Sequence, residues 1–175
     1  SVRFHSLGAK GPVYARSFVR KLLGNEEFCM QIDAATDFSQ GWDTLAIQQW
    51  SKTNNEYAVL SNPPLHTTEK QRKEKNGVMN TEVPRQCSIK VGSEGVPLFG
   101  NQADGKAIGL EEPLLSTAYS PSFVFSKCHL ETTVPHDPFA VQLLETEKFP
   151  HYARLWTRGY DIYTPTVNIV YKDNI

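Results

Sequence analysis

The pattern of apolar and polar residues predicts a helix followed by a strand near the start of the chain. Over residues 11–23, apolar side chains recur at the spacing of one helical face, and basic residues fall elsewhere. The short apolar run 28–32 that follows is typical of a buried strand, and Asp33 comes directly after it. Because open α/β sheets place ligand-binding groups at the carboxyl ends of their strands, Asp33 is a candidate binding residue.

The alternation continues through the rest of the chain, around a long irregular segment. Residues 42–52 predict a helix with Asp43 as its cap, and residues 57–60 predict a second buried strand. Frequent glycines and prolines over residues 61–122 predict a long excursion from the sheet, around one strand at 86–91. Further strands and helices are predicted at 123–128 (strand), 139–148 and 151–157 (helices, with Gly159 as the stop), and 161–165 and 167–171 (strands). This order predicts a single α/β domain over residues 1–175, with a mostly parallel or mixed sheet.

The length and net charge of the chain limit the classes of partner that it could bind. The 175 residues suit one domain, and 18 basic against 19 acidic side chains give a net charge of −1. This balance argues against nucleic acid as a partner, although residues 70–75 form a basic run that we interpret as a solvated helix or loop. No apolar run approaches the roughly 20 residues that cross a bilayer, and the first residues lack the apolar core of a signal peptide. We therefore expect no membrane association.

The three cysteines, Cys29, Cys87 and Cys128, are widely spaced and odd in number. They match neither a disulfide framework nor a Cys-x-x-Cys zinc signature. We therefore expect free, buried thiols in a reducing compartment. The tryptophans, Trp156 among them, are expected in the core, because large aromatic side chains dominate core packing.

Arg16 and Asp33 are the strongest candidates for a ligand-binding pair. A carboxylate at a strand end can hold a divalent cation, which prefers hard oxygen ligands and in turn binds a diphosphate. The planar fork of an arginine can pair with phosphate oxygens. The residues alone leave a structural alternative open, in which Asp33 caps a turn and Arg16 forms a surface ion pair.

Several motifs occur in an order that resembles a known enzyme family, the UDP-GlcNAc-dependent glycosyltransferases that modify hydroxyproline on a ubiquitin-ligase adaptor. The similarity covers most of the chain, is strongest over residues 153–161, and is loose in the middle excursion. The motifs are Ala9-Lys10-Gly11-Pro12-Val13-Tyr14-Ala15-Arg16, Gln31-Ile32-Asp33-Ala34, Gly41-Trp42-Asp43, Val134-Pro135-x-Asp137-Pro138, and Ala153-Arg154-Leu155-Trp156-Thr157-x-Gly159-Tyr160-Asp161, with Pro165 and Val170-Tyr171 after them.

The resemblance implies a fold, a reaction and a set of partners. The fold is GT-A, an α/β nucleotide-binding sheet whose first strands are expected upstream of Ser1. The implied reaction transfers GlcNAc from the donor UDP-GlcNAc to a protein hydroxyl of the hydroxyproline type, in the cytoplasm. The family typically uses Mn²⁺, whose charge offsets that of the departing UDP. The resemblance does not decide whether the protein forms a homodimer or a larger assembly.

The resemblance also assigns roles to individual residues. Arg16 matches the arginine of the family's Gly-Pro-x-x-Ala-Arg motif and is expected near the diphosphate. Asp33 matches the first residue of the Asp-x-His metal motif, and Asp37 is a candidate substitute ligand nearby. Glu147 matches one carboxylate of an acidic pair and is a candidate for acceptor contact or general-base catalysis. Lys172 stands where the family often has histidine, and it could bind a phosphate as a point charge.

Three departures from the family pattern affect polar positions. The histidine of the Asp-x-His motif is Ala35, the second carboxylate of the acidic pair is Lys148, and the C-terminal histidine is Lys172. Alanine cannot ligate a metal ion. The sequence therefore supports two hypotheses, an active transferase that works without metal and an inactive relative that serves as a structural or binding component of a larger assembly.

Overall fold

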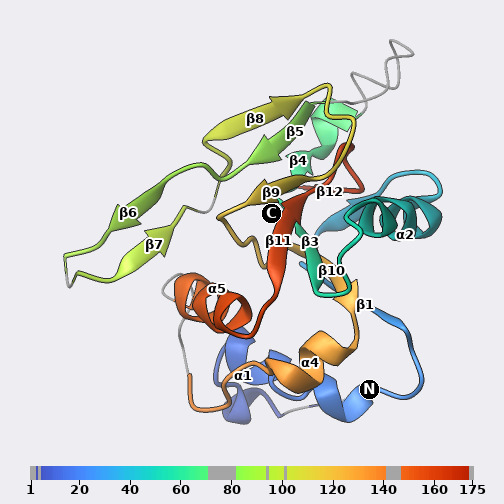
Figure 1. Cartoon of the computed structure of the whole chain (residues 1–175). Helices are drawn as coiled ribbons and strands as arrows, with labels where there is room; N and C mark the ends of the chain where they lie inside the picture. The colour runs from blue at the N-terminus through green and yellow to red at the C-terminus, as the bar shows by residue number, and fades with distance from the viewer. Residues whose placement is uncertain are drawn as a thin grey trace.

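The computed structural model is a mixed α/β fold around a five-stranded sheet with the order β1-β10-β3-β11-β9 (Figure 1). It describes residues 3, 5–70, 82–93, 95–100, 102–140 and 147–173. The strands of this sheet are β1 (Phe28–Ile32), β3 (Ala58–Ser61), β9 (Leu114–Ser116), β10 (Phe123–Lys127) and β11 (Asp161–Thr164). Within this sheet, β3 and β11 run parallel, and the other neighbouring strands run antiparallel. The predicted α/β class is confirmed, in its mixed form.

A second, three-stranded sheet and two hairpins complete the β structure. The second sheet has the order β2-β12-β4, and the hairpins are β5–β8 and β6–β7. Figure 1 shows the β6–β7 hairpin extending away from the body of the protein. The strands are β2 (Thr36–Phe38), β4 (Leu65–His66), β5 (Glu82–Arg85), β6 (Ile89–Val91), β7 (Pro97–Phe99), β8 (Gly105–Ile108) and β12 (Val170–Lys172).

The predicted strand at 86–91 is shorter than expected. It begins only at Ile89, because the Asp104 carboxylate accepts hydrogen bonds from the backbone N–H groups of Cys87 and Ser88. The strand at 28–32 has the predicted limits, but it is a half-buried edge strand rather than a buried one. The single domain and the position of the 61–122 excursion stay predictions.

The helices are shorter at the N-terminus than the sequence predicts. They are η1 (Ser6–Gly8, 3₁₀), α1 (Pro12–Arg16), η2 (Val19–Leu22, 3₁₀), α2 (Trp42–Lys52), α4 (His129–Thr133) and α5 (Lys148–Thr157). The helix predicted over 11–23 is split, because the Ser17 hydroxyl donates to the Tyr14 carbonyl and competes with the helical ladder. Helix α2 is confirmed, but its N-cap is Gly41 in the left-handed region (φ 66°), not Asp43.

Helix α5 (Lys148–Thr157) contains the helix predicted at 151–157 and begins three residues earlier. The predicted helix 139–148 falls partly on residues 141–146, which lie outside the described residues, and Phe139 is not helical. Pro150 is tolerated because it lies in the first turn of α5. Gly159 ends the helix with φ 84°, as predicted. The core position predicted for Trp156 is wrong, since this side chain is 65% exposed.

Strand alternation buries a hydrophobic cluster on each face of the five-stranded sheet. In β3, Val59 belongs to one cluster and Leu60 to the other. The first cluster includes Leu155 of α5 and Leu130 of α4, and the second includes Ala46 of α2. The helices α4 and α5 therefore pack on one face and α2 on the other, as Figure 1 shows. The five-stranded sheet, with β1 at its edge, therefore lies between the two groups of helices.

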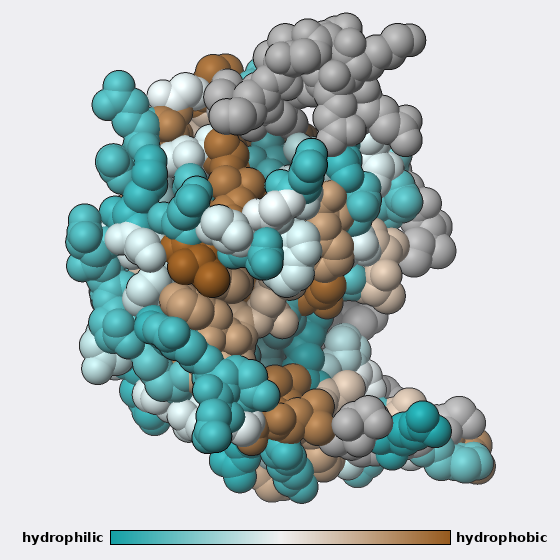
Figure 2. Space-filling model, turned by 90° about the vertical axis from the view of Figure 1, so that its right-hand side faces the viewer, coloured by the Kyte–Doolittle hydropathy of each residue, from teal (hydrophilic) through white to brown (hydrophobic). Residues whose placement is uncertain are grey.

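The surface of the described part carries scattered hydrophobic side chains. On the face in Figure 2 they lie among hydrophilic residues. Single exposed apolar residues are ordinary on protein surfaces. Within the described residues, the helices are too short or too polar to cross a bilayer.

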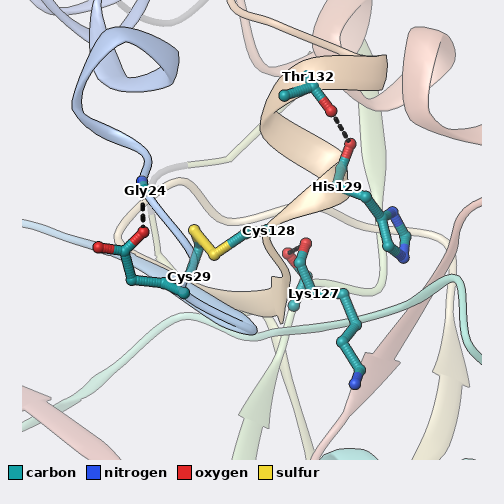
Figure 3. The surroundings of a disulfide bond; sticks show 8 residues. Gly24, Cys29, Lys127, Cys128, His129 and Thr132 are labelled. Atoms are coloured by element: carbon teal, nitrogen blue, oxygen red, sulfur yellow. Dashed lines mark hydrogen bonds between the residues drawn. A yellow bond between two sulfur atoms is a disulfide. The ribbon is translucent and has the colours of Figure 1, made fainter.

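A disulfide bond joins Cys29 of β1 to Cys128, the residue after β10 (Figure 3). The expectation of free, buried thiols is therefore wrong for this pair. The free cysteine, Cys87, is exposed rather than buried. The two cysteines of the bridge are 99 residues apart, and only the antiparallel pairing of β1 with β10 brings them together. Disulfides persist in oxidising environments, so the bond also weighs against the expected reducing compartment.

Candidate functional site

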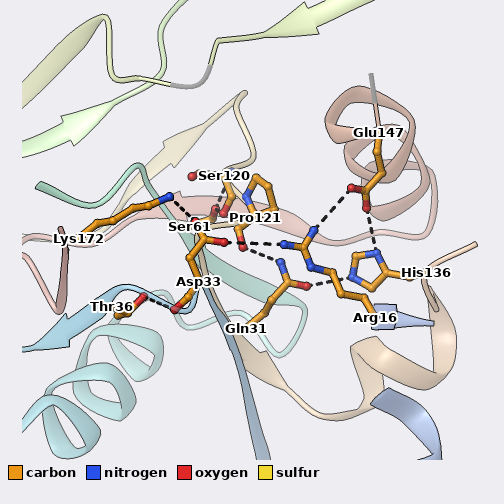
Figure 4. Close-up of polar contacts among 10 residues, drawn as sticks. All are labelled: Arg16, Gln31, Asp33, Thr36, Ser61, Ser120, Pro121, His136, Glu147 and Lys172. Atoms are coloured by element: carbon orange, nitrogen blue, oxygen red, sulfur yellow. Dashed lines mark hydrogen bonds and ion pairs between the residues drawn. The ribbon is translucent and has the colours of Figure 1, made fainter. Parts of the chain in front are cut away.

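Four charged side chains from distant parts of the sequence form one connected row, Lys172–Asp33–Arg16–Glu147, which we call the charged row (Figure 4). Arg16 Nη1 lies 3.6 Å from Glu147 Oε2, and Arg16 Nη2 lies 3.9 Å from Asp33 Oδ1. Lys172 Nζ lies 2.6 Å from Asp33 Oδ2. The side chain of Lys172 is 41% exposed and that of Glu147 only 7%. The row therefore runs from solvent into the protein.

Local backbone structure brings the members of the charged row together. Arg16 is the last residue of α1, Asp33 follows β1, and Glu147 is the N-cap residue of α5. The Thr36 hydroxyl donates to the Asp33 carbonyl at 2.7 Å and stabilises the turn after β1. Strand β2 then pairs with β12 so that Thr36 lies opposite Lys172. This register places the lysine beside the end of β1.

His136 continues the charged row inward through contacts with Glu147 and Gln31. Its Nδ1 lies 3.1 Å from Glu147 Oε1, and its Nε2 lies 3.0 Å from Gln31 Oε1. The Gln31 amide nitrogen donates to the Pro121 carbonyl, which can only accept, so the amide oxygen must face His136. The Nε2 atom of His136 therefore carries hydrogen.

Two buried aromatic side chains, His151 and Tyr119, lie at the inner end of the charged row, and burial favours the neutral form of each. The His151 ring stacks on the His136 ring with centroids 4.2 Å apart. Burial, followed by the positive charges of His136, Arg154 and Arg16, lowers the pKa of His151 well below its ordinary value of 6.5. Burial also raises the pKa of Tyr119, whose ring contacts His151. His151 is therefore neutral in the folded protein at neutral pH.

The neutral His151 predicts a loss of stability in mild acid. An unfolded chain protonates this histidine near pH 6.5 while the folded chain does not, so the unfolded state binds more protons below that pH. We expect the free energy of unfolding to fall as pH drops below about 6.5, by up to about 1.4 kcal/mol per pH unit. Urea unfolding at about pH 7.5 and about pH 5.5 measures the change.

The matched variants are His151→Phe, which keeps a ring against His136, and His5→Phe at an exposed histidine. His151→Phe should lose much of the acid sensitivity, whereas His5→Phe should behave as the wild type. An equal acid effect in wild type and His151→Phe would contradict the neutral, buried ring.

Asp33 is held in its charged form. Burial alone would raise the pKa of Asp33, but hydrogen bonds from Lys172 and Ser122, with the charges of Lys172 and Arg16, outweigh burial and lower it. The carboxylate is therefore ionised at neutral pH, with a cation on each side. Such a carboxylate fixes the position of both cations.

Cavities lie at both ends of the charged row. One of about 400 Å³ is lined by Lys172, Ser122 and His66, among others. A smaller one of about 130 Å³ is lined by Glu147, His151 and Arg154, among others. A ligand in the larger cavity would meet the exposed end of the row, and one in the smaller cavity would meet the inner end.

The residues around Asp33 do not fit a divalent cation. Its carboxylate oxygens face the side chains of Lys172 and Arg16. Asp37, the predicted substitute ligand, lies on β2 with Oδ2 2.8 Å from Lys70 Nζ, and Ala35 has no ligand atom. In the part of the chain that is described, no three His, Cys, Asp or Glu side chains gather as a metal site would require. The predicted metal-binding role of Asp33 and Asp37 finds no support in this geometry.

Four of the predicted site residues meet in the structure, next to two residues that had no assigned site role. Arg16, Asp33, Glu147 and Lys172 form the charged row, whereas Asp37 pairs elsewhere with Lys70. The two neighbours of the row are Gln31 and His136. Both carried a signal, since Gln31 lies on β1 two residues before Asp33 and His136 lies within the Val-Pro-x-Asp-Pro motif.

Comparison with known proteins identifies one family. No curated protein and no solved structure matches the chain significantly. The family model described as Glycosyltransferase (GlcNAc) matches residues 1–173, nearly the whole sequence. The match includes all four members of the charged row. The chain belongs to the Glycosyltransferase (GlcNAc) family.

Proposed function

We propose that this protein transfers N-acetylglucosamine from UDP-GlcNAc to a protein hydroxyl, of the hydroxyproline type, on a GT-A-like fold. Family membership supports glycosyl transfer, and the charged row carries the assignment of the donor site. An arginine held between two carboxylates and a half-exposed lysine at a cavity suit a ligand with a diphosphate. A nucleotide sugar is such a ligand.

Arg16 is the centre of the proposed donor site. Asp33 and Glu147 form ion pairs with the guanidinium on two sides and hold it between them. A fixed fork can bind phosphate oxygens without losing further side-chain freedom, which favours the charge that develops on UDP as it leaves. The larger cavity, lined by Lys172, would hold the donor at the exposed end of the charged row.

The proposed reaction forms one bond and breaks one. The acceptor hydroxyl oxygen bonds to the anomeric carbon of GlcNAc, and the bond from that carbon to the β-phosphate oxygen breaks with its electron pair leaving on UDP. The hydroxyl proton goes to a carboxylate or to a phosphate oxygen. Glu147 lines the smaller cavity, but its two oxygens already face Arg16 and His136. Because both oxygens already have partners, Glu147 acts in this proposal as a positioning residue for Arg16.

A transfer assay tests the proposal. The full chain is incubated with UDP-GlcNAc and a hydroxyproline-containing peptide, and mass spectrometry detects a peptide heavier by one N-acetylhexosamine. We expect this product from the wild type and less of it from Glu147→Gln, through a higher KM for the donor. UDP-GlcNAc binding without any transfer to peptide or water would instead support the inactive relative suggested by Ala35, Lys148 and Lys172.

The cellular location belongs to the same proposal. The family resemblance favours the cytoplasm, whereas the Cys29–Cys128 disulfide favours an oxidising environment. Alkylation of free thiols in the protein isolated from its own cells distinguishes the two. Protection of Cys29 and Cys128 would exclude a reducing location.

A further inference from the structure

The exposed end of the charged row combines a fixed ammonium with an open cavity. Lys172 lies on β12, the middle strand of the three-stranded sheet, opposite His66 of β4. Its Nζ atom donates to Asp33 Oδ2 at 2.6 Å, and the residue lines the cavity of about 400 Å³. An ammonium has three N–H donors, and this contact uses one of them. The other two N–H groups can donate to a ligand in the cavity.

A divalent cation at this position would meet strong repulsion. It would have to approach Asp33 between the ammonium of Lys172 and the guanidinium of Arg16. Both cations repel a divalent ion, and they already engage both oxygens of Asp33. The described residues give such an ion no cluster of ligands to offset this repulsion.

We propose that this protein binds its nucleotide diphosphate without a divalent cation, and that the Lys172 ammonium supplies the charge a metal would otherwise supply. This inference rests on the proposed function. Asp33 then acts as the anchor of the ammonium rather than as a metal ligand. Thr36 supports the arrangement by fixing the backbone carbonyl of Asp33. Lys172 lines the cavity and Arg16 lies on the other side of Asp33, so a diphosphate that contacts Lys172 must extend past Asp33 to reach Arg16.

Titration calorimetry with UDP, in EDTA and then with excess Mn²⁺, tests the inference on the full chain. We expect the same Kd in both buffers for the wild type. Lys172→Met should raise the Kd by about 10- to 100-fold in EDTA, because it removes a charge-assisted hydrogen bond. Lys172→Arg should bind more tightly than Lys172→Met, since it keeps the charge. Urea unfolding of each variant shows whether it is folded.

The matched control is Lys70→Met, which removes another lysine bound to an aspartate, Asp37, at 2.8 Å. It should leave the Kd for UDP unchanged. UDP binding that requires Mn²⁺ would overturn the inference and leave the proposed function standing. Metal-free binding that is unaffected by Lys172→Met would overturn the role of Lys172. Absence of UDP binding in both buffers would overturn the proposed function and this inference together.

Discussion

The Arg16→Met variant is expected to lose sugar transfer almost completely, with kcat/KM falling about a thousandfold. Arg16 links Asp33 and Glu147 and presents the only fork-shaped cation in the charged row. Removing it takes away bidentate phosphate contacts and leaves two carboxylates of like charge facing the donor site. Steady-state kinetics with UDP-GlcNAc and a peptide acceptor measure the loss.

Two further variants separate catalysis from folding. Arg16→Lys keeps the charge that Asp33 and Glu147 require but loses the planar fork, so we expect a folded protein that retains about a tenth of the activity or less. Arg20→Met, at an exposed arginine of η2, should leave kcat/KM unchanged. Wild-type kinetics in a folded Arg16→Met variant would contradict the donor site described here.

Loss of the Cys29–Cys128 disulfide is expected to lower the free energy of unfolding by about 2–4 kcal/mol. The bond spans 99 residues, and cross-links across long loops restrict the unfolded chain most. For a protein of this size the melting temperature should fall by on the order of 10 °C. Urea unfolding of the Cys29→Ser, Cys128→Ser double variant measures the cost.

The same variant tests whether the disulfide supports the site. Asp33 follows β1, the edge strand that Cys29 anchors to the end of β10. A looser β1 should weaken UDP binding as well as lower stability. Cys87→Ser, at the exposed free cysteine, is the control and should change neither property. Equal unfolding midpoints of the double variant and the wild type would show that the bond contributes nothing to stability.

The sequence predicted the layers of the fold better than the details of its strands. Short apolar runs located β1, β3, β10 and β11, and their alternation correctly indicated helices on a mixed sheet. The edge position of β1 could not be predicted, because burial depends on which strands become its neighbours. The split between α1 and η2 depends on one hydroxyl, that of Ser17, which helical periodicity does not register.

The candidate site was predicted in its charged members but not in its connections. The motifs identified Arg16, Asp33, Glu147 and Lys172 as separate residues with separate roles. The register of β2 with β12 brings Lys172 to Asp33, and this contact is the basis for proposing that an ammonium takes the place of a metal. Asp37 is near Asp33 in sequence but pairs with Lys70. The disulfide was missed for the same reason, since strand pairing rather than spacing brings its cysteines together.

A crystal structure of the chain with UDP-GlcNAc tests the central claim most directly. We predict that the diphosphate lies in the larger cavity, with phosphate oxygens within hydrogen-bonding distance of both Arg16 and Lys172. Asp33 should still contact both cations, because it anchors them rather than the ligand. A diphosphate bound elsewhere on the protein, away from these two side chains, would contradict the account.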